Sequence, residues 1–132
     1  MTETTGNRSA IWPCFRYEDP RAAIRFIVEV LGFTEAAVYG EGDRVDHAEL
    51  RWPGGGGVML GSVKDGDPPG ERPGVGSVYV VTSEPDAVFE RVVRAGARVT
   101  RPMREEDYGS RGFTCGDPEG VQWSFGTYAG AE

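Results

Sequence analysis

Two side chains that could transfer protons stand two positions apart in the segment HAEL. His47 and Glu49 share one face of the strand expected there, because side chains alternate between the two faces of an extended chain. A neighbouring imidazole and carboxylate could serve as acid and base in an isomerisation, a ring opening or a lyase reaction. The structural alternatives are that His47 is only a cross-strand partner, or that Glu49 pairs with Arg16 or Arg51, which would remove the only carboxylate base.

The chain offers few ligands for a catalytic metal ion. Such an ion needs about three protein ligands, usually histidines and carboxylates. His47 is the one histidine, so a site with two histidines and one carboxylate cannot be assembled within one chain. The cysteines, Cys14 and Cys115, both lie in apolar, strand-like segments. We expect buried, reduced thiols there, with a disulfide as the alternative, and no nucleophile at Cys14, which lacks an activating neighbour.

Length and charge limit the partners. With 132 residues the chain can form one domain with a core but not two ordinary domains. A formal net charge of −7 argues against nucleic acid or an anionic membrane as the main partner. No apolar segment approaches the roughly 20 residues of a membrane helix, and MTETTGNRSA lacks the apolar core of a secretory signal. We therefore expect a cytoplasmic protein.

The predicted elements occur twice in the same order. The first helix begins at Asp19 and ends at Gly32; the second begins at Ser83, in capping-box spacing with Asp86, and ends at Gly96. One strand precedes each helix and three follow it. The predicted strands are 11–16, 34–39, 45–52 and 58–61, then 78–82, 98–103, 112–116 and 121–128. Such an internal repeat decides the fold.

The repeat predicts an α+β fold of two βαβββ modules within a single domain, 1–132. Module one covers about residues 10–62 and module two residues 75–128. The linker, residues 63–74, reads VKDGDPPGERPG, which is polar and rich in proline and glycine.

The last strand has one apolar and one polar face. In GDPEGVQWSFGTY, the residues Asp117–Gly120 favour a turn, and alternation then follows. Trp123 shares its face with Val121 and Phe125 and is predicted to belong to the core. Ser124 lies on the opposite, polar face.

The doubled modules, with DPRAAIRFIVEVLGF early and DPEGVQWSFGTY late, resemble the vicinal-oxygen-chelate superfamily over about residues 10–128. This superfamily contains glyoxalase I, extradiol dioxygenases and bleomycin-resistance proteins. The resemblance implies that each module curls into half a barrel, that paired modules enclose a cavity, and that a homodimer completes it. Ser124 would then face the cavity.

Metal-dependent members of that superfamily carry four ligands at fixed points. Carried over to this chain, these points fall on Trp12, Glu49, Ser77 or Val78, and Ser124. Only Glu49 is a competent ligand. The chain is therefore most similar to the metal-free, antibiotic-binding resistance proteins, and we expect no metal and no other cofactor.

The resemblance also selects the residues that would contact a ligand. It places one face of each sheet in the cavity, and Tyr108 and Arg111 resemble a loop that rims it. Tyr108 could instead only pack its own loop, and Trp12 could be plain packing. The predicted ligand-binding residues are Trp12, Cys14, Arg16, His47, Glu49, Arg51, Tyr79, Tyr108, Arg111, Gln122 and Ser124.

Three functions follow as hypotheses. The first is a protein that sequesters a hydrophobic, aromatic or polycyclic antibiotic or toxic metabolite without catalysis, because aromatic walls with a few polar groups are typical of small-molecule sites. The second is a glyoxalase-type isomerase or lyase, independent of metal or with a displaced ion, that uses His47 and Glu49. The third is a protein-interaction module, which predicts a filled cavity and an exposed apolar patch. Turnover separates the first two.

Overall fold

The computed structural model describes residues 9–131, so most of the segment MTETTGNRSA lies outside the described residues. Module one contains β1 (Cys14–Tyr17), α1 (Pro20–Arg25), the π-helix η2 (Phe26–Leu31), β2 (Thr34–Glu41), β3 (Arg44–Arg51) and β4 (Gly57–Ser62). The linker carries a short 3-10 helix, η3 (Pro69–Glu71). Module two contains β5 (Ser77–Val81), α2 (Pro85–Arg94), β6 (Arg98–Glu105), β7 (Arg111–Gly116) and β8 (Gln122–Gly126).

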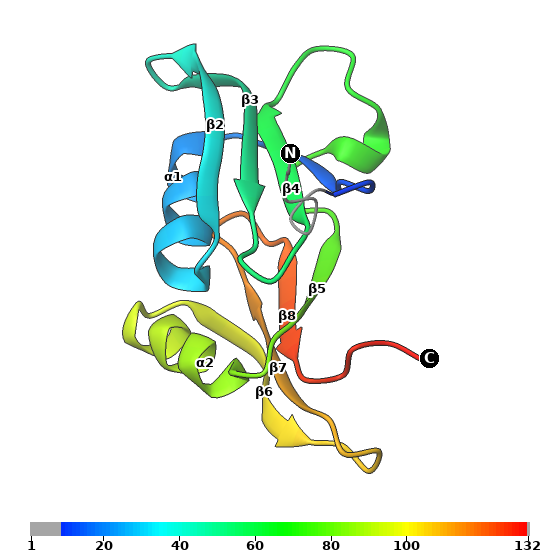
Figure 1. The fold of residues 1–132 in the computed structure, drawn as a ribbon. Coiled ribbons are helices and arrows are strands. Elements are labelled where there is room, and N and C mark those ends of the chain that lie inside the picture. The colour runs from blue at the N-terminus through cyan, green and yellow to red at the C-terminus, as the bar shows by residue number, and fades with distance from the viewer. Residues whose placement is uncertain (1–8, 132) are drawn as a thin grey trace.

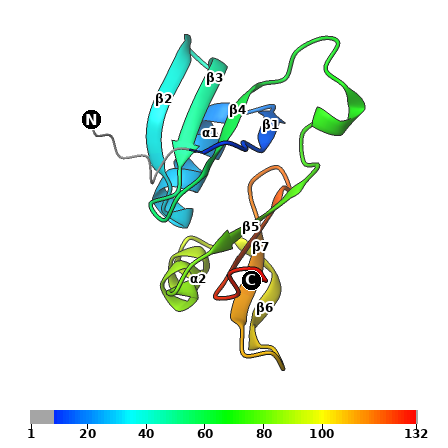
Figure 2. The same cartoon turned by 45° about the vertical axis from the view of Figure 1, so that its right-hand side comes forward.

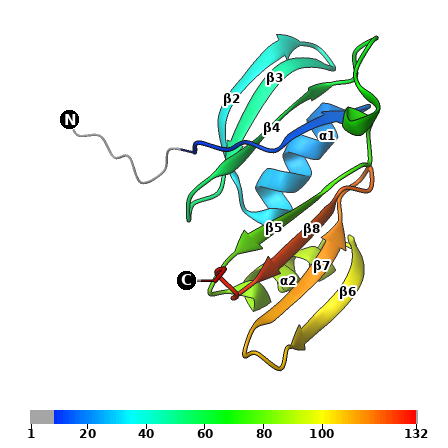
Figure 3. The same ribbon diagram turned by 90° about the vertical axis from the view of Figure 1, so that its right-hand side faces the viewer.

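Each module forms one four-stranded mixed sheet. The strand orders are β1-β4-β3-β2 and β5-β8-β7-β6, with the first pair parallel and the others antiparallel. Figure 1 shows the two modules one above the other, and in Figure 3 both sheets turn one face to the viewer while α1 and α2 lie behind. Figure 2 shows the linker running outward from β4, through η3, before it returns to β5. The predicted α+β fold of two βαβββ modules with curved, unclosed sheets is confirmed.

The first helical segment begins and ends at the predicted residues, whereas the second helix is capped differently from the prediction. The Asp19 side chain accepts a hydrogen bond from the Ala22 amide at 3.1 Å, and Gly32 ends the first helical segment with φ of 101°. The second half of that segment is a π-helix rather than a continuation of α1. The predicted capping box is wrong: α2 has Glu84 as its N-cap, without a side-chain cap.

One apolar core joins the two modules. Trp123, which is fully buried, packs its ring against Phe15 and Phe33 of module one at centroid distances of 6.2 and 5.5 Å. Gly76, just before β5, lies so close to Phe15 that a Cβ there would approach the ring to 2.8 Å. The prediction that Trp123 belongs to the core is confirmed, and its ring lies at the module boundary.

The turn before β8 is organised by a buried carboxylate. Asp117 Oδ1 accepts hydrogen bonds from the amides of Glu119, Gly120 and Val121 at 3.0, 3.0 and 3.1 Å. Its Oδ2 accepts from Trp123 Nε1 at 3.1 Å. The segment DPEGV therefore folds around one side chain, which explains the local turn in terms of hydrogen bonds.

The same turn fastens module two to module one. Tyr17 Oη of β1 donates to Asp117 Oδ2 at 2.5 Å, and burial, followed by the negative charge of Asp117, raises the pKa of Tyr17. The Glu119 carboxylate accepts hydrogen bonds from the backbone amides of Glu18 and Asp19, both at 2.8 Å. These contacts fix the start of α1 against the turn of the other module.

The two cysteines have different environments, and both are free. Cys115 is buried, and burial, with the nearby charge of Asp117, raises its pKa to about 12, so its thiol is unreactive. Cys14 is exposed, which corrects the expectation of a buried thiol. The reason is alternation on β1: Phe15 and Tyr17 turn to the core, and Cys14 turns to the face without a helix.

No helix among residues 9–131 is both long and apolar enough to cross a membrane.

Candidate functional site

The helix-free faces of the two sheets form the candidate site, which we call the open face. In module one, its central row runs across the strands through Cys14, Met59, Glu49 and Ala37. In module two, the matching row is Tyr79, Ser124, Thr114 and Arg101. Cys14 and Tyr79 are 65 residues apart, as are Met59 and Ser124. The repeat therefore extends to the register of individual side chains.

This register corrects the placement of Glu49 at the second family metal position. Ser124 lies on β8 beside Tyr79 of the parallel edge strand, and in module one Met59 lies on β4 beside Cys14 in the same way. Glu49 lies one strand further on, at the place equivalent to Thr114. Met59, rather than Glu49, is thus the counterpart of Ser124.

The resulting donor set does not fit a divalent metal. Met59 therefore takes the place of Glu49 as the second of the four family metal-ligand positions. These positions then carry an indole, a thioether and two hydroxyls, at Trp12, Met59, Ser77 and Ser124. Among the described residues, no three histidine, cysteine, aspartate or glutamate side chains come together in a group that could hold an ion. Catalytic divalent ions are usually held by histidine and carboxylate side chains, and these four positions carry neither.

The His47 and Glu49 side chains contact each other on the open face. His47 Nε2 lies 2.9 Å from Glu49 Oε2, and the Tyr39 ring stacks on the imidazole at a centroid distance of 6.4 Å and an interplanar angle of 15°. Both members of the pair are partly accessible. The pair can share a proton, which is the minimum that the acid–base hypothesis requires.

The Trp12 ring lies against the start of β4. The residue below it is Gly57, where a Cβ would approach the indole to 2.9 Å, so this close contact requires glycine. The Arg51 guanidinium carbon lies 5.1 Å from the ring centroid, which is a cation–π arrangement. The Trp12 ring is partly buried by these contacts and remains outside the core.

Arg16 is directed toward the linker. Its Nε lies 3.6 Å from Asp67 and 3.7 Å from Glu71. The cross-strand pair with Glu49 that the sequence allowed is therefore not formed by Arg16. These two ion pairs hold the linker beside β1 instead.

Module two has a small pocket of about 100 Å³ on the open face. Three predicted residues border it: Tyr79, Tyr108 and Ser124. The Tyr79 hydroxyl donates to the Tyr128 carbonyl at 2.8 Å, and the Tyr108 ring meets the Tyr128 ring edge-on at 5.7 Å. The pocket also contains residues that the sequence analysis missed, namely Arg101, Glu106, Ser110 and Tyr128.

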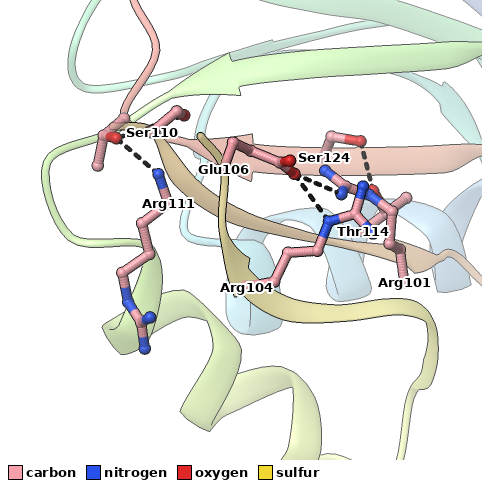
Figure 4. Close-up of polar contacts among 8 residues, drawn as sticks. Arg101, Arg104, Glu106, Ser110, Arg111, Thr114 and Ser124 are labelled. Atoms are coloured by element: carbon pink, nitrogen blue, oxygen red, sulfur yellow. Dashed lines mark hydrogen bonds and ion pairs between the residues drawn. The ribbon is translucent and has the colours of Figure 1, made fainter. Parts of the chain in front are cut away.

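Of the five predicted residues in module two, the other two lie apart from this pocket. Arg111 donates to Asp86 of α2 at 2.8 and 3.0 Å, on the helix side of the sheet, and Figure 4 shows its side chain directed away from Ser124. Gln122 accepts a hydrogen bond from Thr100 at 2.6 Å and borders a different cleft of about 590 Å³ at the module boundary. That cleft is larger, but Phe26 is the one aromatic ring that lines it and Gln122 the one predicted residue.

Comparison with known proteins agrees with this architecture. The model of the Glyoxalase/Bleomycin resistance protein/Dioxygenase superfamily matches residues 11–125, and the chain belongs to this superfamily. The crystal structure of TioX from Micromonospora sp. ML1 superimposes with a TM-score of 0.75 at 30% identity, over 90% of this chain and 98% of that one.

Two further relatives extend the comparison. TnmS3, an antibiotic binding protein from Streptomyces sp. CB03234, has the same fold, with a TM-score of 0.68 at 22% identity over 89% of this chain and 97% of that one. The uncharacterized protein Mb0911c of Mycobacterium bovis is 28% identical over 131 residues, which is 89% of this chain and 82% of that protein.

Proposed function

We propose that this protein binds a hydrophobic, aromatic or polycyclic small molecule on its open face and sequesters it without chemical change. The observation that carries the proposal is the chemistry of that face: an indole, a thioether and two hydroxyls stand where the resemblance places metal ligands, and the exposed rings of Tyr39 and Tyr79 lie on the same face. Antibiotics and toxic aromatic metabolites are the class of ligand that such walls suit. The shared fold of TnmS3, described as an antibiotic binding protein, supports the choice of class.

Exposed rings on the open face supply the means of binding. Tyr79 is 49% exposed in module two, and Tyr39 is 61% exposed in module one. Stacking on such rings contributes on the order of 1 kcal/mol beyond the area that it buries. The free thiols of Cys14 and Cys115 suit the reducing cytoplasm, where we expect the protein to act.

A second copy of the chain is expected to cover the open face. One chain leaves both rows of the face at least partly exposed, and a closed two-fold dimer is the commonest way to bury such a surface. Size-exclusion chromatography with light scattering should give twice the chain mass of 14.3 kDa at micromolar protein. A species of one chain mass at that concentration would contradict the dimer.

Substitution of Trp12 tests the binding face directly. Trp12→Ala is expected to weaken ligand binding more than about tenfold, because it removes both the stacking energy and the buried area, whereas Trp12→Phe should retain most of the affinity. Isothermal titration calorimetry with a panel of polycyclic antibiotics measures this. Trp52→Phe is the control, since that ring is partly buried and packs against Phe33 and Phe125 of the core. Equal losses for Trp12→Ala and Trp52→Phe would contradict the assignment.

The contact between His47 and Glu49 supports a second candidate function, a metal-independent isomerase or lyase. It predicts that the ligand recovered from the wild-type protein has changed structure, and that Glu49→Gln abolishes the change while preserving binding. If the protein only sequesters its ligand, the ligand is recovered unchanged from both the wild-type protein and Glu49→Gln.

A further inference from the structure

The pocket of module two has a charged wall that aromatic stacking does not explain. Arg101 on β6 stands opposite Thr114 of β7, whose Oγ1 lies 2.7 Å from Ser124 Oγ. A guanidinium and two hydroxyls therefore occupy neighbouring places in one cross-strand row, as Figure 4 shows. All three are groups that bind an anionic oxygen well.

The protein itself supplies an anion at this place. Glu106 Oε2 accepts hydrogen bonds from Arg101 Nη1 at 3.0 Å and from Arg104 Nε at 2.7 Å. The bonds from Arg104 and Arg101 hold the pKa of Glu106 below its usual range. The Glu106 side chain is 21% exposed, less than either arginine. One carboxylate thus sits between two guanidinium groups, at the edge of the small pocket.

The Glu106 side chain is not what holds its loop. The hairpin between β6 and β7 is closed by backbone bonds, from the Glu106 amide to the Ser110 carbonyl at 2.7 Å and from the Gly109 amide to the Glu106 carbonyl at 3.0 Å. Gly109 has φ of 86°, as this turn requires. The carboxylate can therefore rotate away from Arg101 while the backbone of the hairpin stays in place.

We propose that Arg101 binds an acidic group carried on an aromatic ring of the ligand, a phenolate or a carboxylate, and that Glu106 occupies this place until the ligand displaces it. Tyr79 and Tyr108 form the aromatic sides of the pocket, and its volume of about 100 Å³ suits one substituted ring rather than a whole polycycle. The proposal rests on the proposed function, since it names the chemistry at one end of the bound molecule.

Benzoate and benzamide test this pocket separately from the larger ligand. Arginine Nε–H signals of the full-length protein are followed by NMR at neutral pH and low salt during titration with each compound. The wild-type protein is compared with Arg101→Met, Glu106→Gln and the control Glu105→Gln. Glu105 carries the same charge one residue earlier, but it contacts Arg111 at 3.7 Å, on the other side of the strand.

Benzoate should shift the Arg101 Nε–H signal saturably, and benzamide should not. Glu106→Gln removes the competing anion and should strengthen benzoate binding about fivefold, whereas Arg101→Met should weaken it about tenfold. Glu105→Gln should match the wild type. Equal responses to benzoate and benzamide, or equal affinity in Glu106→Gln and Glu105→Gln, would overturn the proposal. If benzoate binds as described and every polycyclic compound fails to bind, the acidic-group site stands and the sequestration function fails.

Discussion

Asp117→Ala is expected to lower the free energy of unfolding by about 3 kcal/mol, because it leaves several buried hydrogen-bond donors without an acceptor. The side chain accepts three backbone amides of its own turn, and it also accepts Tyr17 Oη and Trp123 Nε1. The turn and the contact with module one should therefore loosen together. Urea denaturation at fixed protein concentration measures the change.

Two further variants sharpen this measurement. Asp117→Asn keeps one side-chain oxygen and should lose less stability than Asp117→Ala. That oxygen can still accept either from the backbone amides of the turn or from Tyr17 Oη and Trp123 Nε1. Asp107→Ala removes an exposed carboxylate from the β6–β7 hairpin and should shift stability by less than about 0.5 kcal/mol. If Asp117→Ala unfolded at the same urea concentration as Asp107→Ala, the account of the turn would be wrong.

Trp123→Ala is expected to lower the free energy of unfolding by about 4 kcal/mol, since it leaves a cavity at the module boundary. The ring is fully buried between Phe15 and Phe33, and its indole N–H donates to Asp117. Trp123→Phe keeps most of the volume and loses the hydrogen bond, so about 1 to 2 kcal/mol is expected.

The effect of Trp123→Ala can be compared with that of Trp12→Ala in the same protein. Trp12→Ala should change stability by about 1 kcal/mol or less, since that ring lies on the open face rather than in the core. The effects of Trp123→Phe and Asp117→Ala should not add, because both remove the same hydrogen bond. Equal melting temperatures for Trp12→Ala and Trp123→Ala would show that the two rings have been assigned to the wrong sides of the sheet.

The features that could be predicted from the sequence depend on local rules. Proline and glycine recur at matching places in both halves, and this recurrence predicts the doubled module. Strict alternation in β8 predicted that Trp123 is buried and that Ser124 faces the other way. Both follow from the geometry of an extended chain, which needs no knowledge of distant partners.

The parts of the site that could not be predicted depend on pairing between strands. Met59 is the counterpart of Ser124 because of the parallel register between β1 and β4, which a single strand does not reveal. Arg101 was missed because β6 carries irregularities on both sides of it, which break simple alternation. Arg111 was placed on the cavity rim by its resemblance to a family loop, whereas a partner on α2, Asp86, holds it on the helix side.

Native mass spectrometry after incubation with polycyclic antibiotics tests the central claim most directly. The complex of protein and compound is transferred intact to the gas phase. The compound is then released and its mass is measured. We expect a non-covalent complex with the dimer, a released ligand of unaltered mass, and a much smaller fraction of complex in Trp12→Ala. A released compound of altered mass, or no complex with any member of the panel, would contradict it.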